Sequence, residues 1–177
     1  MAGTRRKEMT RLLFRTALVE LMQKKSFSKI SITEICGQAD LNRTTFYLHY
    51  SDQQELLQDV VHDVLERTEK YLRGSCKHKN MTEFLTDYLD YIRTNASSFH
   101  TLMCGDISSE ARGVLIEGLL KDMKEEWPNY GPPIKNDYTY TFIMQGSIHV
   151  IIRWIEQDFD LPSKELAALI LQLITKV

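Results

Sequence analysis

Five side chains that commonly bind nucleic acid lie close together near residue 45 of this 177-residue chain. Arg can form paired hydrogen bonds to guanine, Thr offers a hydroxyl and a methyl group, and Tyr and His can donate to phosphate oxygens. The five residues are Arg43, Thr44, Thr45, Tyr47 and His49. If Leu41, Phe46 and Tyr50 face a core, the five point outward from one short helix. This pattern predicts a DNA-binding surface.

Two capped helices are needed to position these side chains. Asn42 is a good N-cap for a helix from Arg43 to about His49, because its side chain can accept from a backbone N–H two or three residues ahead. Such a helix is roughly 12 Å long and suits a major groove about 12 Å wide. Asn42 can equally act only as a cap, since capping uses the side chain that would otherwise touch a base.

The preceding helix begins at Ser31. Glu34 follows three residues later, which is the capping-box spacing. Ile32, Ile35 and Cys36 repeat at the i, i+3, i+4 spacing that buries one helix face. The stretch 31–50 therefore predicts a helix-turn-helix, and the alternative is a purely structural helical hairpin.

Charge is divided unevenly along the chain. Residues 1–50 contain nine Lys and Arg against four Asp and Glu, whereas the remaining residues contain 13 against 20. A basic region beside a helix-turn-helix favours release of counterions from a duplex. The sequence TRRKEMTR at 4–11 adds a basic arm that could follow the DNA backbone or a minor groove.

Helical periodicity continues almost throughout, and no strand pattern is visible. We expect an all-α protein with an N-terminal three-helix domain and a linking helix over 1–73, and a C-terminal helical domain for regulation and dimerisation over 74–177. The linking helix should cover 52–72, with a connection at 74–79. Asn80 and Glu83 predict the cap of the next helix, whose apolar stripe runs to Ile92. Further helices are predicted over about 97–104, 108–127, 135–157 and 163–176, with breaks at 128–133 and 158–162.

The last two predicted helices carry more apolar surface than one small domain can cover. Ile148, Ile151, Ile152 and Ile155 line one face of the first, and the second, LAALILQLI at 166–174, is apolar on nearly all sides. A helix this apolar must be covered on two sides. The expected cover is a second copy, giving a symmetric homodimer built as a four-helix bundle.

The N-terminal motifs resemble those of TetR-type transcriptional regulators. The matching pieces are TEIC at 33–36, TFYLHY at 45–50 and ELL at 55–57. The resemblance implies that Asn42, Arg43, Thr44 and Thr45 read bases, that Tyr47 and His49 hold phosphates, and that Thr33 joins the DNA contacts. Asp40 stands where the family commonly has Gly, and Gln53 stands where a Lys is usual.

The same resemblance implies a repressor that binds double-stranded DNA at a palindromic operator, and a small-molecule effector in the C-terminal domain. The effector would favour a conformation in which the two DNA-binding parts are wrongly spaced. Aromatic residues are abundant in that domain. Polar groups embedded among them, namely Tyr88, Gln145 and His149, are the candidate effector contacts.

Other classes of function lack the residues they need. Neither a G-x-S-x-G turn, an H-E-x-x-H pair nor a phosphate-binding glycine loop occurs, so an enzyme is not expected. Cys36, Cys76 and Cys104 are widely spaced, which argues against a disulfide framework or a metal site, and no cofactor is expected. The chain shows neither a long apolar span nor a signal peptide, which favours the cytoplasm.

Two alternatives remain open within the same fold. The protein could be a transcriptional activator, or an interaction module that no longer binds DNA. Binding to a duplex must weaken steeply with salt, so salt dependence separates the second alternative from the others.

Overall fold

The computed structural model describes residues 2–74, 80–107, 109–130 and 136–176, with the backbone alone for 2–4, 122–123 and 125–130. Within these residues every regular element is helical, so the all-α prediction is confirmed. The α-helices are α1 (Ala2–Met22), α2 (Ile32–Gln38), α3 (Arg43–Tyr47), α4 (Gln53–Gly74), α5 (Met81–Thr94), α6 (Ala96–Cys104), α7 (Ser109–Tyr130), α8 (Asp137–Glu156) and α9 (Ser163–Thr175), and one 3-10 turn spans Phe27–Lys29.

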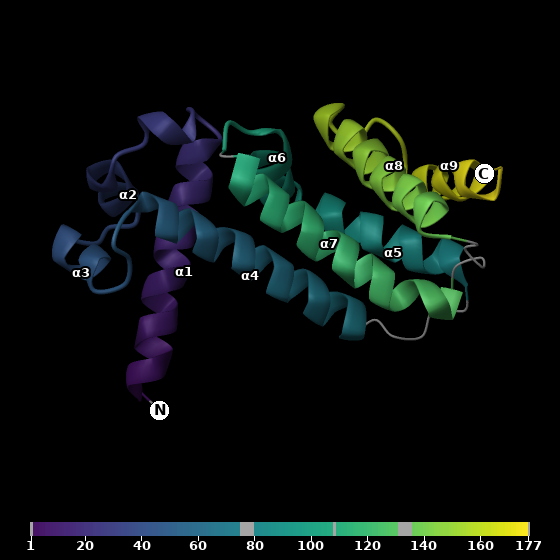
Figure 1. Ribbon diagram of the computed structural model, residues 1–177. Coiled ribbons are helices and arrows are strands. Elements are labelled where there is room, and N and C mark those ends of the chain that lie inside the picture. Colours follow the sequence, from purple (N-terminus) through teal and green to yellow (C-terminus); the bar gives the residue numbers. More distant parts are fainter. Residues whose placement is uncertain (1, 75–79, 108, 131–135, 177) are drawn as a thin grey trace.

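Helices α1 to α3 and the first turns of α4 form the head of the molecule (Figure 1). Their shared core contains Phe14, Leu18, Ile35, Phe46 and Leu57, all fully buried. The rings of Phe14 and Phe46 meet edge to face with centroids 5.3 Å apart. Aromatic pairs of this geometry add to the stability gained from area burial. The short α3 is therefore fixed through its buried face.

Helix α4 runs from the head into the body, which comprises α5 to α9 (Figure 1). It packs against α1 in the head and against α7 in the body. A Cβ added to Gly118 of α7 would lie 2.5 Å from Leu65 Cδ2 of α4, so glycine permits the close approach of these helices. A second head-to-body contact joins Gln23, just after α1, to Ser97 of α6 by a side-chain hydrogen bond.

The body is filled by large apolar side chains. Phe84, Tyr88 and Leu89 of α5 are almost or wholly inaccessible, as are Phe99 of α6 and Ile148 of α8. Helix α5 packs on α9, and α6 packs on α8. No helix among the residues described combines the length and apolar character needed to cross a membrane.

Most predicted helix boundaries agree with the structure to within two residues, but one predicted break is wrong. The break at 128–133 fails in its first part, because α7 continues through Pro128 to Tyr130. Proline lacks an N–H and weakens a helix, yet α7 continues past it, and α7 packs against α4, a contact the sequence does not reveal. Residues 131–135 lie outside the described residues, as do 75–79 of the predicted connection, including Cys76.

Candidate DNA-binding surface

The start of α2 is fixed by the predicted capping box. Ser31 Oγ accepts from the Glu34 N–H at 3.3 Å, and Glu34 Oε2 accepts from the Ser31 N–H at 2.9 Å. Lys25 Nζ also donates to Glu34 Oε1. These bonds, the one from Lys25 first, lower the pKa of Glu34 from 4.5 to about 2. Glu34 is therefore ionised at neutral pH and secures the first turn of α2.

A tight turn connects α2 to α3. Asp40 has φ of 53°, in the left-handed region that Asp enters more readily than most residues. Leu41 N–H donates to the Cys36 carbonyl at 2.9 Å and closes the turn. Cys36 itself is buried, and burial raises the pKa of its thiol. Aspartate thus adopts here a backbone conformation that glycine adopts readily, and Cys36 is a core residue, as predicted.

Asn42 is the N-cap of α3, as the sequence predicts. Its Oδ1 accepts from the Thr45 N–H at 2.7 Å and from the Thr45 hydroxyl at 2.9 Å. Helix α3 then ends at Tyr47, with Leu48 as its C-cap. The helix is two residues shorter than expected, so His49 follows it instead of belonging to it.

The predicted contact residues do not all face outward. Thr33, Asn42, Arg43, Thr44 and Tyr47 are exposed. Arg43 and Tyr47 are one turn apart and interact, which raises the pKa of Arg43. These side chains form one polar surface at the end of the head.

Thr45 and His49 are half-buried, which corrects the expectation that both point outward. The hydroxyl of Thr45 is used in capping α3. The His49 ring lies 6.4 Å from the Phe14 ring and 6.1 Å from the Tyr50 ring, so it rests on the core. Leu48, for which the sequence predicts no role, is 78% exposed beside them.

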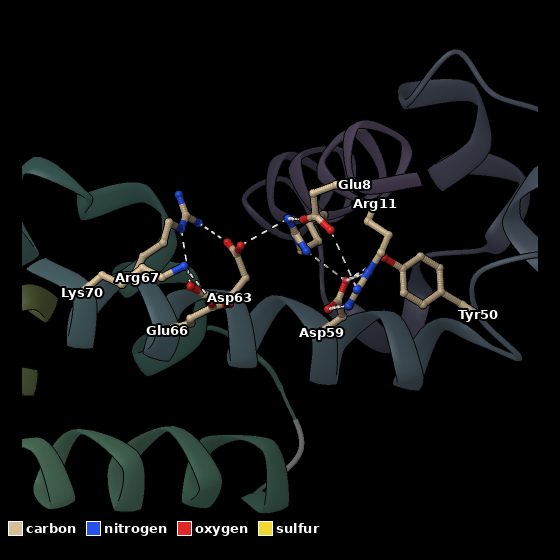
Figure 2. Close-up of polar contacts among 9 residues, drawn as sticks. Glu8, Arg11, Tyr50, Asp59, Asp63, Glu66, Arg67 and Lys70 are labelled. Atoms are coloured by element: carbon tan, nitrogen blue, oxygen red, sulfur yellow. Dashed lines mark hydrogen bonds and ion pairs between the residues drawn. The ribbon is translucent and has the colours of Figure 1, made fainter. Parts of the chain in front are cut away.

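A buried charge network behind α3 was also missed from the sequence (Figure 2). Asp59 Oδ2 accepts from the Tyr50 hydroxyl at 2.7 Å, from Arg11 Nε at 3.2 Å and from Arg15 Nη1 at 3.3 Å. Burial opposes ionisation of Asp59, but the bonds from Arg11 and Tyr50 and the charge of Arg15 outweigh it, so its pKa is lowered. Burial and the Asp59 carboxylate together raise the pKa of Tyr50. Asp59 is a carboxylate that accepts hydrogen bonds from three residues, Arg11, Arg15 and Tyr50.

The network extends along both helices. Arg15 Nη2 contacts Glu8 Oε1 at 2.9 Å and Asp63 Oδ1 at 3.2 Å. Asp63 in turn pairs with Arg67 on the next turn of α4 (Figure 2). The sequence signal for this network is the spacing of three or four residues between its charges along each helix, since residues at that spacing share a helix face.

The family model TetR_C_8, described as the C-terminal region of transcriptional regulators, matches residues 79–176, which is more than half of the chain. The chain belongs to the TetR family. It is therefore a helix-turn-helix transcriptional regulator and not an enzyme.

The chain is also similar to one protein by sequence and to solved structures by fold. An uncharacterised HTH-type transcriptional regulator of Haemophilus influenzae is 42% identical over 64 residues, which cover 34% of this chain and about a third (31%) of that protein. The solved structure of a TetR regulator from Streptococcus agalactiae 2603V is similar over 98% of both chains, with a TM-score of 0.75 at 21% identity.

A second solved structure shares the fold at lower identity. It is FadR of Bacillus subtilis in complex with stearoyl-CoA, with a TM-score of 0.68 at 16% identity over 92% of this chain and 96% of that chain.

The candidate effector residues of this TetR regulator do not come together. Tyr88 is fully buried in the body core on α5. Gln145 and His149 are exposed on α8, where His149 Nδ1 lies 2.7 Å from the Gln145 carbonyl oxygen. The expectation that both are embedded among aromatic residues is therefore wrong. An effector role for the three residues stays a prediction.

Proposed function

We propose that this TetR regulator is a homodimeric repressor that binds a palindromic operator through α2 and α3 and is released by a small-molecule effector bound in the body. The observation that carries the proposal is the exposed polar surface of α3, formed by Arg43, Thr44 and Tyr47 around a buried Phe46. Arg can read guanine in the major groove, and the hydroxyls can hold bases or phosphates. Thr33 and Asn42 lie exposed beside them.

Dimerisation is supported by apolar side chains that α8 and α9 leave uncovered. Phe142 and Tyr138 of α8, with Leu169 and Leu173 of α9, are exposed. Between the two helices lies an apolar groove of about 290 Å³, lined among others by Phe142, Val150, Ile170 and Leu173. Contiguous exposed apolar surface of this kind is typical of protein interfaces. A second copy placing the same helices there forms a closed, two-fold contact.

Two heads held by such a dimer would meet half-sites about one helical turn, or a multiple of it, apart. The head-to-body contacts through α4 and α7, and through Gln23 and Ser97, link this spacing to the body. Regulation by an effector is supported by FadR, a protein of the same fold whose structure contains stearoyl-CoA. An effector that prefers a different head spacing would lower operator affinity by a population shift.

The test is selection of bound duplexes from a random-sequence library by the purified protein, followed by titration of the selected duplex at several salt concentrations. A two-fold related consensus and an affinity that falls steeply with salt are expected, because cationic side chains displace counterions. A protein that enriches no sequence would contradict the proposal. Transcription from a promoter that carries the selected duplex then separates repression from activation.

A further inference from the structure

We propose that Asp59 is a positioning residue for DNA recognition. By accepting a hydrogen bond from the Tyr50 hydroxyl, it holds the C-terminal end of α3 in one orientation against α1 and α4. This inference rests on the proposed DNA-binding function. Asp59 is only 8% exposed and lies behind α3, so it is not itself a contact to DNA.

Helix α3 is too short to hold its own direction. It has five residues, and isolated helices shorter than about 12 residues are marginal in water. Its first end is fixed by the Asn42 cap and by the bond from Leu41 N–H to the Cys36 carbonyl. Its buried face is fixed by Phe46. The orientation of the helix then depends on how its second end is held.

The second end leads directly to Tyr50. Its ring packs against Phe14 and Phe46, with centroids 6.1 and 5.5 Å apart. Ring packing limits the position of Tyr50 but permits sliding, whereas a 2.7 Å bond to a fixed carboxylate sets a specific distance and direction. Because Tyr50 is three residues from Tyr47, a displacement of Tyr50 moves the exposed surface of α3.

Asp59 is itself held firmly from a second helix. Arg11 donates to both of its carboxylate oxygens, and Arg15, also 8% exposed, donates to Oδ2. Two-point Arg–carboxylate contacts are geometrically specific. Figure 2 shows Asp59, Arg11 and Tyr50 converging, and Arg11 and the Tyr50 hydroxyl both donate to the Asp59 carboxylate. One buried group therefore joins α1, α4 and the end of α3.

Asp63 provides a matched comparison. It lies one turn further along α4 and bonds to the same Arg15, at 3.2 Å, and to Arg67. Those partners belong to α1 and α4, not to the end of α3. Loss of the Asp63 charge should weaken the contact between α1 and α4 while leaving the Tyr50–Asp59 bond in place.

The experiment compares Tyr50→Phe, Asp59→Asn and Asp63→Asn with the wild type. Each protein is titrated with the duplex of about 30 base pairs that the wild type selects, which spans two half-sites, and with a scrambled duplex of the same composition. Circular dichroism at the binding temperature establishes that each variant is folded. The readout is the ratio of the affinity for the selected duplex to the affinity for the scrambled duplex. A loss of stability alone does not change this ratio in a protein that is folded.

Tyr50→Phe and Asp59→Asn should lose about tenfold in affinity for the selected duplex, equivalent to about 1.4 kcal/mol. Affinity for the scrambled duplex should change by less than about twofold, and the salt slope should stay constant, because the Lys and Arg residues that neutralise phosphates are unchanged. Asp63→Asn should keep the wild-type ratio.

Three results would overturn the inference. The first is wild-type discrimination in Tyr50→Phe. The second is a loss of discrimination in Asp63→Asn as large as that in Asp59→Asn, which would mean that the network only stabilises the fold. If Asp59→Asn does not fold, Tyr50→Phe alone tests the role of the Tyr50–Asp59 hydrogen bond. A wild-type protein that selects no duplex would overturn the DNA-binding function itself and this inference with it, and that result is visible before any variant is made.

Discussion

Helix α3 in the head of this TetR regulator and helices α8 and α9 in its body leave opposite kinds of side chain uncovered. On α3 the exposed residues are mainly polar, including Arg43, Thr44 and Tyr47, with Leu48 beside them. On α8 and α9 the prominent exposed residues include Phe142 and Leu173. A polar surface suits a charged, hydrated polymer, whereas an apolar surface is stable only when another apolar surface covers it. The two surfaces of this chain therefore differ in the chemistry of the partner that each one suits.

The largest effect should come from placing charge on the apolar surface of the body. Phe142→Glu combined with Leu173→Glu introduces carboxylates where the side chains are 64% and 48% exposed in the single chain. Burying these charges in a dimer is costly, so sedimentation velocity should show monomers. Loss of the second head should reduce affinity for a selected palindromic duplex by about 10²- to 10⁴-fold, the usual gain from bivalency.

Met9→Glu is the control for that prediction. Met9 is similarly exposed, at 54%, but lies on α1 of the head. This variant should sediment as the wild type does. If the double variant also stays dimeric, α8 and α9 do not form the interface. The apolar surface of the body would then not explain dimerisation.

On the polar surface, single substitutions should alter sequence preference without altering assembly. Arg43→Ala should cost about 1–3 kcal/mol at one base pair, or relax the preference there, because a paired Arg–guanine contact is lost. Tyr47→Phe should weaken all duplexes about equally, since a phosphate contact carries no sequence information. Titrations against single-base operator variants distinguish the two patterns. Equal losses for both variants would remove the assignment of Arg43 to a base.

Features that depend on neighbours in sequence could be predicted. The caps at Ser31 and Asn42 act within three residues, so the spacing of residue types was sufficient. The apolar character of 166–174 likewise indicated that α9 needs more cover than the body supplies, and Leu173 is indeed exposed.

Features that depend on which helix faces which could not be predicted. Asp59 bonds to Arg11 across 48 residues and to Arg15 across 44, and nothing local shows that α1 and α4 meet at this turn. His49 has the chemistry of a phosphate contact, but its ring packs beside Phe14. Gln145 and His149 have aromatic neighbours in sequence, yet they lie on the outer face of α8.

A smaller effect should separate the two functions of Asn42. Asn42→Ala removes the cap of α3 and should lower the free energy of unfolding by about 1 kcal/mol. Asn42→Ser keeps a capping oxygen, so its stability should stay within a few tenths of a kcal/mol of the wild type. Thermal unfolding measures both. If Asn42→Ser nevertheless binds the selected duplex less tightly, the amide group contacts DNA in addition to capping the helix.

The smallest effect is a difference in acid sensitivity between head and body. Two helix starts in the head use carboxylates: Glu34 completes the capping box of α2, and Asp52 and Glu55 secure the start of α4, whereas α3 is capped by the amide of Asn42. In the body, the amide oxygens of Asn80 and Asn136 cap α5 and α8. Amides do not titrate, so acid should loosen the head first.

The sign follows from Glu34. Its pKa is about 2 in the folded chain against an ordinary 4.5, so its stabilising effect is complete above about pH 4.5 and is lost as the pH falls towards 2. Both tryptophans lie in the body, in α7 and α8. Far-UV circular dichroism should therefore begin to change at a higher pH than tryptophan fluorescence. Glu34→Gln keeps a capping amide without a titrating group, so it should reduce the difference between the pH values at which the two signals change. If the two signals change at the same pH in the wild type, head and body resist acid equally.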